Sequence, residues 1–193
     1  GEAQVQQAVR LAAQSLAQLG AAWVLEVSHM GYLFGLFDAL GVPENARPGL
    51  LEKLREKNAH ELRRAAQAAG LDAAGAAALT GLLELSGSCE ETLAKAESAC
   101  CNDRMRAAAA ELRALAKTLE ASGGAVRLDL SLAGEMEYYN GLVFQGYLQG
   151  LPRPLLKGGR YDLLMQKFTP GAGAIGFAVY PRRCRGTART GSC

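Results

Sequence analysis

The sequence lacks a charge imbalance and a long apolar run, and each absence excludes a class of protein. Its 21 basic and 19 acidic residues leave a net charge of +2, which gives no electrostatic reason to expect a nucleic-acid or membrane surface. No apolar run reaches the roughly 18 residues that a membrane span needs. The N-terminus also lacks the basic and then apolar layout of a signal peptide. We therefore expect a cytoplasmic protein without a nucleic-acid or membrane partner.

Histidine and cysteine are too scarce and too scattered to indicate a metal site. The five cysteines contain no C-x-x-C spacing, and the two histidines, His29 and His60, are not near a cysteine or a cluster of acids in the sequence. An odd number of badly spaced cysteines favours reduced thiols over a disulfide framework. We expect no metal, and nothing in the sequence indicates a cofactor.

The first forty residues predict a helix, a strand and a second helix. Residues 4–20 place apolar side chains near a 3.6-residue period and end at a glycine, as an amphipathic helix does. Residues 22–32 alternate apolar and polar side chains, the pattern of a half-buried strand. Helical spacing then continues as far as Gly41. With 49% apolar residues, the chain is able to bury a substantial core around these elements.

The middle of the chain is rich in helix-forming residues. From about residue 49 to 122, Ala, Leu, Glu, Lys and Arg dominate and β-branched residues are almost absent, so we expect this block to be all helix. Asn58, followed three residues later by Glu61, predicts a capped helix that Gly70 closes.

Strand patterns return near the C-terminal end, over residues 125–132, 138–148 and 172–180. Strands and helices without regular βαβ alternation indicate an α+β fold with an antiparallel sheet and a helical insertion. The expected division of the chain is residues 1–43 and 123–180 for the sheet-containing core, 44–122 for the all-helical insertion, and 181–193 for a disordered or non-native tail.

Two glycine-containing motifs each allow two interpretations. Asn140-Gly141 is a hairpin signal, since both residues tolerate positive φ, but the glycine would equally let a ligand or another backbone approach. The paired glycines of "KGGRYD", residues 157–162, leave room above the sheet for a small molecule beside Tyr161, and a tight turn explains them about as well.

Other chemical patterns are weak. "GAGAIG", residues 171–176, matches a dinucleotide fingerprint formally, but a strand and not a helix follows it, so we interpret it as the approach to the last strand. Glu135 and Glu137 would form a general acid/base pair or, more commonly for carboxylates two apart on a strand, a solvated pair. No Ser-His-Asp set is indicated around either histidine.

The order of "EYYNGLVFQGY", "KGGRYD" and "AIGFAVY", with a helical segment ahead of them, resembles the catalytic core of histidyl-tRNA synthetases. That resemblance extends nearly to Tyr180 and implies a class II aminoacyl-tRNA synthetase-like sheet with flanking helices. It also implies that tyrosines surround a histidine ligand, namely Tyr138, Tyr139 and Tyr161.

The departures from that family concern its catalytic groups. Gly134 stands where the synthetases have an arginine that stabilises charge developing on the activated carboxylate and phosphate. Motif 1 and the ATP-binding motif 2 have no counterpart here, and Tyr180-Pro181 interrupts motif 3. The sequence is therefore expected to be a segment of a longer, non-catalytic parent.

A synthetase-like chain without these groups is similar to the regulatory subunits of ATP phosphoribosyltransferase, in which "YYNG-VFQG" and an ending like "IGFAVY" are typical. This resemblance implies a hetero-oligomer with the short-form catalytic subunit of that glycosyltransferase, self-association, and allosteric feedback control of histidine biosynthesis by histidine. No catalytic residue is expected. The expected remnant of the histidine pocket is Glu137, Tyr138, Tyr139 and Tyr161.

Two other hypotheses remain open from the sequence. One is a fragment of a histidyl-tRNA synthetase catalytic domain, which would be part of an enzyme. The other is a structural or dimerisation domain that binds no ligand.

Overall fold

A mixed six-stranded sheet forms the centre of the protein, in the strand order β2-β3-β1-β4-β5-β6. The computed structural model describes residues 2–119, 125–133, 139–166, 169 and 173–180. Its strands are β1 Trp23–His29, β2 Ser86–Ser88, β3 Ala125–Asp129, β4 Leu142–Leu148, β5 Leu156–Arg160 and β6 Ile175–Val179. Strand and helix content confirm the α+β fold class. One strand pair, β1 with β3, is parallel, whereas the expected sheet was antiparallel throughout.

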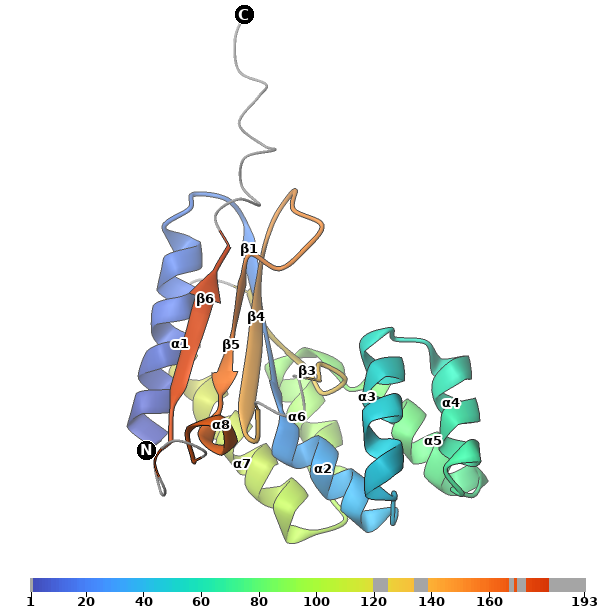
Figure 1. Ribbon diagram of the computed structural model, residues 1–193. Coiled ribbons are helices and arrows are strands. Elements are labelled where there is room, and N and C mark those ends of the chain that lie inside the picture. The colour runs from blue at the N-terminus through green and yellow to red at the C-terminus, as the bar shows by residue number, and fades with distance from the viewer. Residues whose placement is uncertain (1, 120–124, 134–138, 167–168, 170–172, 181–193) are drawn as a thin grey trace, which may run out of the picture.

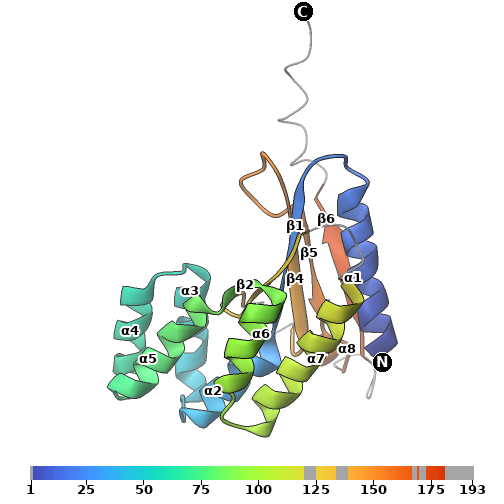
Figure 2. The same cartoon turned by 180° about the vertical axis from the view of Figure 1, so that it is seen from behind.

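Helices cover one face of this sheet and flank it on one side. They are α1 Glu2–Ala17, α2 Met30–Ala39, α3 Arg47–Arg55, α4 Ala59–Ala68, α5 Ala73–Gly81, α6 Cys89–Ser98, α7 Asp103–Leu119 and α8 Asp162–Gln166, with 3₁₀ turns η1 Glu44–Ala46 and η2 Leu82–Glu84. Figure 2 shows α1 and α7 lying across one face of the sheet. The group α3 to α5 stands to one side, beyond α2 (Figure 1). None of the described helices is long and apolar enough to cross a bilayer.

The covered face of the sheet carries the apolar core. Leu25 and Val27 of β1 are buried there, and Phe144 of β4 is fully buried. Gly146 lets β4 approach α1, because a Cβ at this position would lie 2.6 Å from a methyl carbon of Leu16. The alternation of apolar and polar residues in β1 therefore separates a core face from an open face.

The block predicted to be all helix contains one strand. Residues Ser86–Ser88 form β2, which pairs antiparallel with β3. The Leu130 N–H donates to the Leu85 carbonyl at 2.9 Å and continues this pairing. The prediction was wrong here because a Ser-Gly-Ser strand has no side-chain period and forms only where the edge of β3 offers hydrogen-bond partners.

The helix predicted to begin after Asn58 is confirmed, with the Asn58 half of its expected reciprocal cap; the Glu61 side chain pairs with Arg64 instead. The Glu61 N–H donates to Asn58 Oδ1 at 3.1 Å, which satisfies one of the orphan donors at the start of α4. Gly70 follows the helix with a φ of +91°, the left-handed backbone that favours glycine. Both ends of α4 are thus encoded locally.

Asn140-Gly141 does not form a hairpin turn. It is a bend that leads into β4, and β1 lies between β3 and β4, so no hairpin is possible there. The Asn140 N–H donates to the Arg160 carbonyl at 3.3 Å. A Cβ on Gly141 would lie 2.9 Å from Arg160 Cδ. The glycine therefore allows the close approach of a side chain from β5.

Candidate functional site

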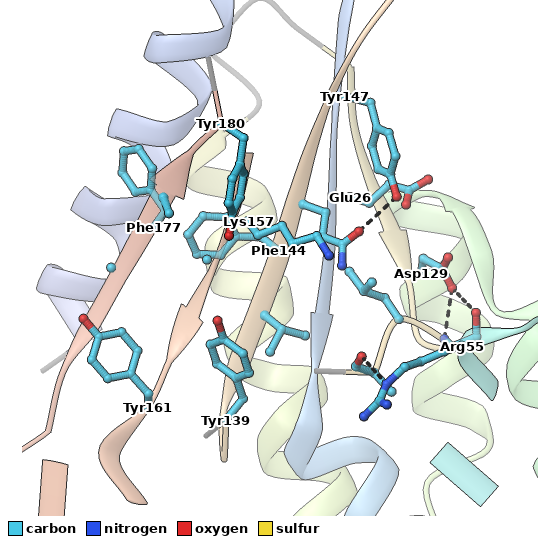
Figure 3. Close-up of a pocket in the computed structure, with 18 of the residues that line it drawn as sticks. Glu26, Arg55, Asp129, Tyr139, Phe144, Tyr147, Lys157, Tyr161, Phe177 and Tyr180 are labelled. Carbon is cyan, nitrogen blue, oxygen red and sulfur yellow. Dashed lines mark hydrogen bonds between the residues drawn. The ribbon is translucent and has the colours of Figure 1, made fainter. Parts of the chain in front are cut away.

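A cleft of about 720 Å³ lies on the open face of the sheet. Its floor is formed by β1, β4, β5 and β6, and one wall is formed by residues at the end of α3 and after β3 (Figure 3). Tyr139 and Tyr161 stand at one end, and Tyr147 lies beside Glu26 towards the other. The cleft thus combines apolar and polar walls, as small-molecule sites do.

Two tyrosines rest on the sheet because glycines lie beneath them. A Cβ on Gly159 would meet the Tyr139 ring at 2.6 Å, and one on Gly176 would meet the Tyr161 hydroxyl at 2.9 Å. Side chains at either position would lift the rings off the sheet. In Figure 3 the hydroxyl groups of Tyr139 and Tyr161 point in the same direction, towards the end where Tyr180 lies. The glycine of "KGGRYD" that faces the cleft therefore makes room for a tyrosine, and the paired glycines lie in β5, which ends at Arg160, and not in a tight turn.

The opposite wall is held by a buried aspartate. Asp129 Oδ1 accepts hydrogen bonds from the Ser131 N–H at 3.0 Å and from its hydroxyl at 2.6 Å. Lys57 donates to Asp129 Oδ2 at 2.6 Å and so ties the segment after α3 to β3. Burial lowers the pKa of Lys57, but its hydrogen bond to Asp129 and their attraction outweigh that effect and raise it.

Three polar side chains form a row across the floor of the cleft. Glu26 of β1 pairs in register with Gln145 of β4, and Gln145 pairs with Lys157 of β5. Cross-strand partners share a face of the sheet, so all three belong to the open face. The Tyr147 hydroxyl donates to Gln145 Oε1 at 3.0 Å and orients the amide. Burial and the nearby Glu26 raise the pKa of Tyr147 to about 12, so it remains a neutral donor.

Burial makes the ionisation of Glu26 in the cleft unfavourable. Burial raises its pKa above 4.5, and the negative charge of Asp129 raises it further, while Lys57 and Arg127 lower it. Within the described residues its carboxylate accepts no hydrogen bond. Ionised Glu26 therefore lowers the stability of the protein.

We expect a Glu26→Gln variant to be more stable than the wild type at pH 7. The folded carboxyl binds its proton more tightly than the unfolded one, so wild-type stability falls as the pH rises above about 4.5. The glutamine has no such loss, and the two proteins should converge below that pH. Urea unfolding at pH 4 and pH 7 measures the difference, and a variant that is less stable at pH 7 would show that Glu26 contributes to the fold.

His29 has a structural role. Its Nδ1 accepts the Gly31 N–H at 3.0 Å, which caps α2, and its Nε2 lies 3.1 Å from Glu111 Oε2. The hydrogen bond to His29 lowers the pKa of Glu111 despite the carboxylate's partial burial. These two contacts account for the position of His29 as part of the fold, without a catalytic role beside a nucleophile.

The structure places two of the four predicted site residues in the cleft. Tyr139 and Tyr161 line it, whereas Glu137 and Tyr138, like Gly134, lie outside the described residues. Sequence reasoning missed Glu26 and Lys157. The alternating pattern of β1 did assign Glu26 to the polar face, but the register that aligns it with Lys157 has no local signal.

Comparison with known proteins finds relatives in two related groups. A family model described as histidyl-tRNA synthetase matches residues 1–184. The ATP phosphoribosyltransferase regulatory subunit of Shouchella clausii is 40% identical over 157 residues, which cover 79% of this chain and 39% of that protein. The chain thus spans about two fifths of the length of that relative.

Solved structures show the same fold. The crystal structure of an ATP phosphoribosyltransferase regulatory subunit/histidyl-tRNA synthetase from Bacillus halodurans matches with a TM-score of 0.83 and 31% identity, over 92% of this chain and 48% of that one. A chain of the ATP phosphoribosyl transferase HisG:HisZ complex from Thermotoga maritima matches with a TM-score of 0.73 and 19% identity, over 93% of this chain and 61% of that one.

Proposed function

This chain belongs to the histidyl-tRNA synthetase family, and from that premise we propose that it is part of a non-catalytic regulatory subunit of ATP phosphoribosyltransferase. It would act in the cytoplasm, in complex with the short-form catalytic subunit, on the first step of histidine biosynthesis. Similarity at 40% identity to a protein of that name supports this assignment over a synthetase.

The cleft lined by Tyr139 and Tyr161 is the observation that carries the proposal. In the resemblance described above, tyrosines at these positions surround histidine, and the cleft is large enough for an amino acid. Gly134 cannot supply the charge that the synthetase arginine supplies at the same position, so the retained pocket is suited to binding without activation of the carboxylate.

Histidine would regulate the complex by binding one of its states more tightly than the other. A ligand with equal affinity for both states shifts neither population, so the cleft must differ between an active and an inhibited complex. Lys57 provides a physical link for such a difference, because it joins the segment after α3 to the wall of the cleft at Asp129.

The test is the turnover of a short-form catalytic subunit with and without the full-length protein across a histidine titration. We expect the full-length protein to raise turnover and histidine to reverse the effect. Tyr161→Ala should shift the inhibition midpoint to at least about tenfold more histidine through loss of an aromatic wall. Leu19→Ala, an exposed position beyond α1, is the control and should leave the midpoint unchanged.

Unchanged turnover at every histidine concentration would overturn the proposal. Histidine-dependent ATP–pyrophosphate exchange by the same preparation would then support the synthetase alternative.

A further inference from the structure

The row of polar residues on the cleft floor has opposite charges at its two ends. Glu26 and Lys157 are separated by one strand, and adjacent strands lie about 4.8 Å apart, so the two backbone positions are about 10 Å apart. Gln145 lies between them, with its carbonyl oxygen held by Tyr147. The amide nitrogen of Gln145 makes no hydrogen bond within the described residues.

Neither Glu26 nor Lys157 makes a side-chain hydrogen bond or ion pair in the part of the chain that the structure describes, although the charges of Lys57 and Arg127 favour ionised Glu26. Lys157 makes no ion pair with any described carboxylate, although Glu26 is on the same face of the sheet. Two other basic groups line this wall: Lys57 pairs with Asp129, and Arg55 donates to the Ala133 carbonyl. In Figure 3 the Lys157 side chain extends across the floor in the direction of Glu26. A half-buried acid and an exposed base thus face the same cleft without a direct hydrogen bond or ion pair to any described residue.

We propose that Glu26 and Lys157 select the ligand of this cleft as an α-amino acid zwitterion. Lys157 binds the carboxylate of the ligand, the Gln145 amide donates to the same group, and Glu26 accepts from the α-ammonium group. The identification of that amino acid as histidine rests on the proposed function.

The position of the polar row relative to Tyr139 and Tyr161 determines the orientation that we propose for the ligand. With the zwitterion over the row, the side chain of the ligand lies towards Tyr139 and Tyr161. Within the described residues the Tyr161 hydroxyl has no hydrogen-bond partner, so it is available to a ring nitrogen. A ligand ammonium would add to the positive charges of Lys57 and Arg127 that already favour ionised Glu26.

Two histidine analogues, each lacking one of the two charges, test the carboxylate contact and the ammonium contact separately. Histidinol has an alcohol in place of the carboxylate, and imidazolepropionate lacks the amine. Calorimetry on the full-length protein measures the dissociation constant of each. We expect wild-type protein to bind both analogues at least about tenfold more weakly than histidine.

Two variants then assign the contacts. Lys157→Met should weaken histidine and imidazolepropionate binding about tenfold or more and leave histidinol binding unchanged. Glu26→Gln should weaken histidine and histidinol binding by a similar factor and leave imidazolepropionate binding unchanged. Lys95→Met and Glu84→Gln repeat the same charge changes at exposed positions away from the cleft and should change none of the constants.

The outcomes distinguish this inference from the proposed function. Equal weakening of histidine and histidinol by Lys157→Met, or no effect of either cleft variant, would overturn the charge selection while regulation of the catalytic subunit still stands. If the wild-type protein activates the catalytic subunit but binds no histidine, the charge selection is likewise overturned and the regulation still stands. The expected binding pattern without any effect on turnover would support the inference and overturn the proposed function.

Discussion

A Gly158→Ala variant should lose about 3 kcal/mol of its free energy of unfolding. Gly158 lies in register between Phe144 of β4 and Phe177 of β6, whose ring centroids are 6.3 Å apart. An added Cβ would lie 2.5 Å from Phe144 Cζ, 2.6 Å from Phe177 Cβ and 2.6 Å from the Gly176 carbonyl oxygen. The last is backbone and cannot rotate away, so overpacking must be relieved by movement of β6. Urea unfolding measures the loss.

Gly49→Ala is the matched control for that experiment. Gly49 lies in α3 and a Cβ there meets nothing within 4 Å, so alanine should raise stability by about 0.5–1 kcal/mol through helix propensity. If Gly158→Ala proves as harmless as Gly49→Ala, the close contact between β5 and its neighbours is not required by the fold.

Loss of the Asp129 carboxylate is the second large effect that we expect. Asp129→Ala removes the acceptor of two hydrogen bonds from Ser131, which is itself buried. An orphaned buried donor costs about 1–3 kcal/mol, so the variant should lose about 2–3 kcal/mol in urea unfolding. The wall of the cleft should loosen with it.

Two further variants separate the hydrogen bonds of Asp129 from its ion pair. Asp129→Asn retains an acceptor for Ser131 and should lose less than the alanine variant. Lys57→Met removes only the ion pair, and with the Lys57 side chain 58% exposed we expect it to cost about 0–1 kcal/mol. A Lys57→Met loss as large as that of Asp129→Ala would show that the ion pair, and not the buried hydrogen bonds, stabilises this wall.

The elements predicted well are those that local pattern specifies. β1 followed from the alternation of Leu25 and Val27 with Glu26, and α4 followed from the cap at Asn58. β2 and the parallel pairing of β1 with β3 were not predicted, because both depend on segments far apart in the sequence. Such pairings leave no period in the strand itself.

The candidate site was accessible from the sequence only in part, for the same reason. Tyr139 and Tyr161 belong to motifs that a resemblance identifies. Glu26, Asp129 and Lys157 come from three different strands and are brought to one face of the sheet only by the strand pairing. An acid in a half-buried strand is ordinarily a solvated residue. The residues around Glu26 in the sequence therefore did not indicate a cleft.

The parallel pairing of β1 with β3 has a consequence for how the chain acquires its structure. Residues 30–124 separate these two neighbouring strands, so their pairing requires closure of a long loop. The contacts among α3, α4 and α5 are local by comparison, and their hydrogen bonds form within short stretches of chain. The helical group is therefore expected to fold early, and the centre of the sheet, with the cleft on its open face, is expected to assemble late.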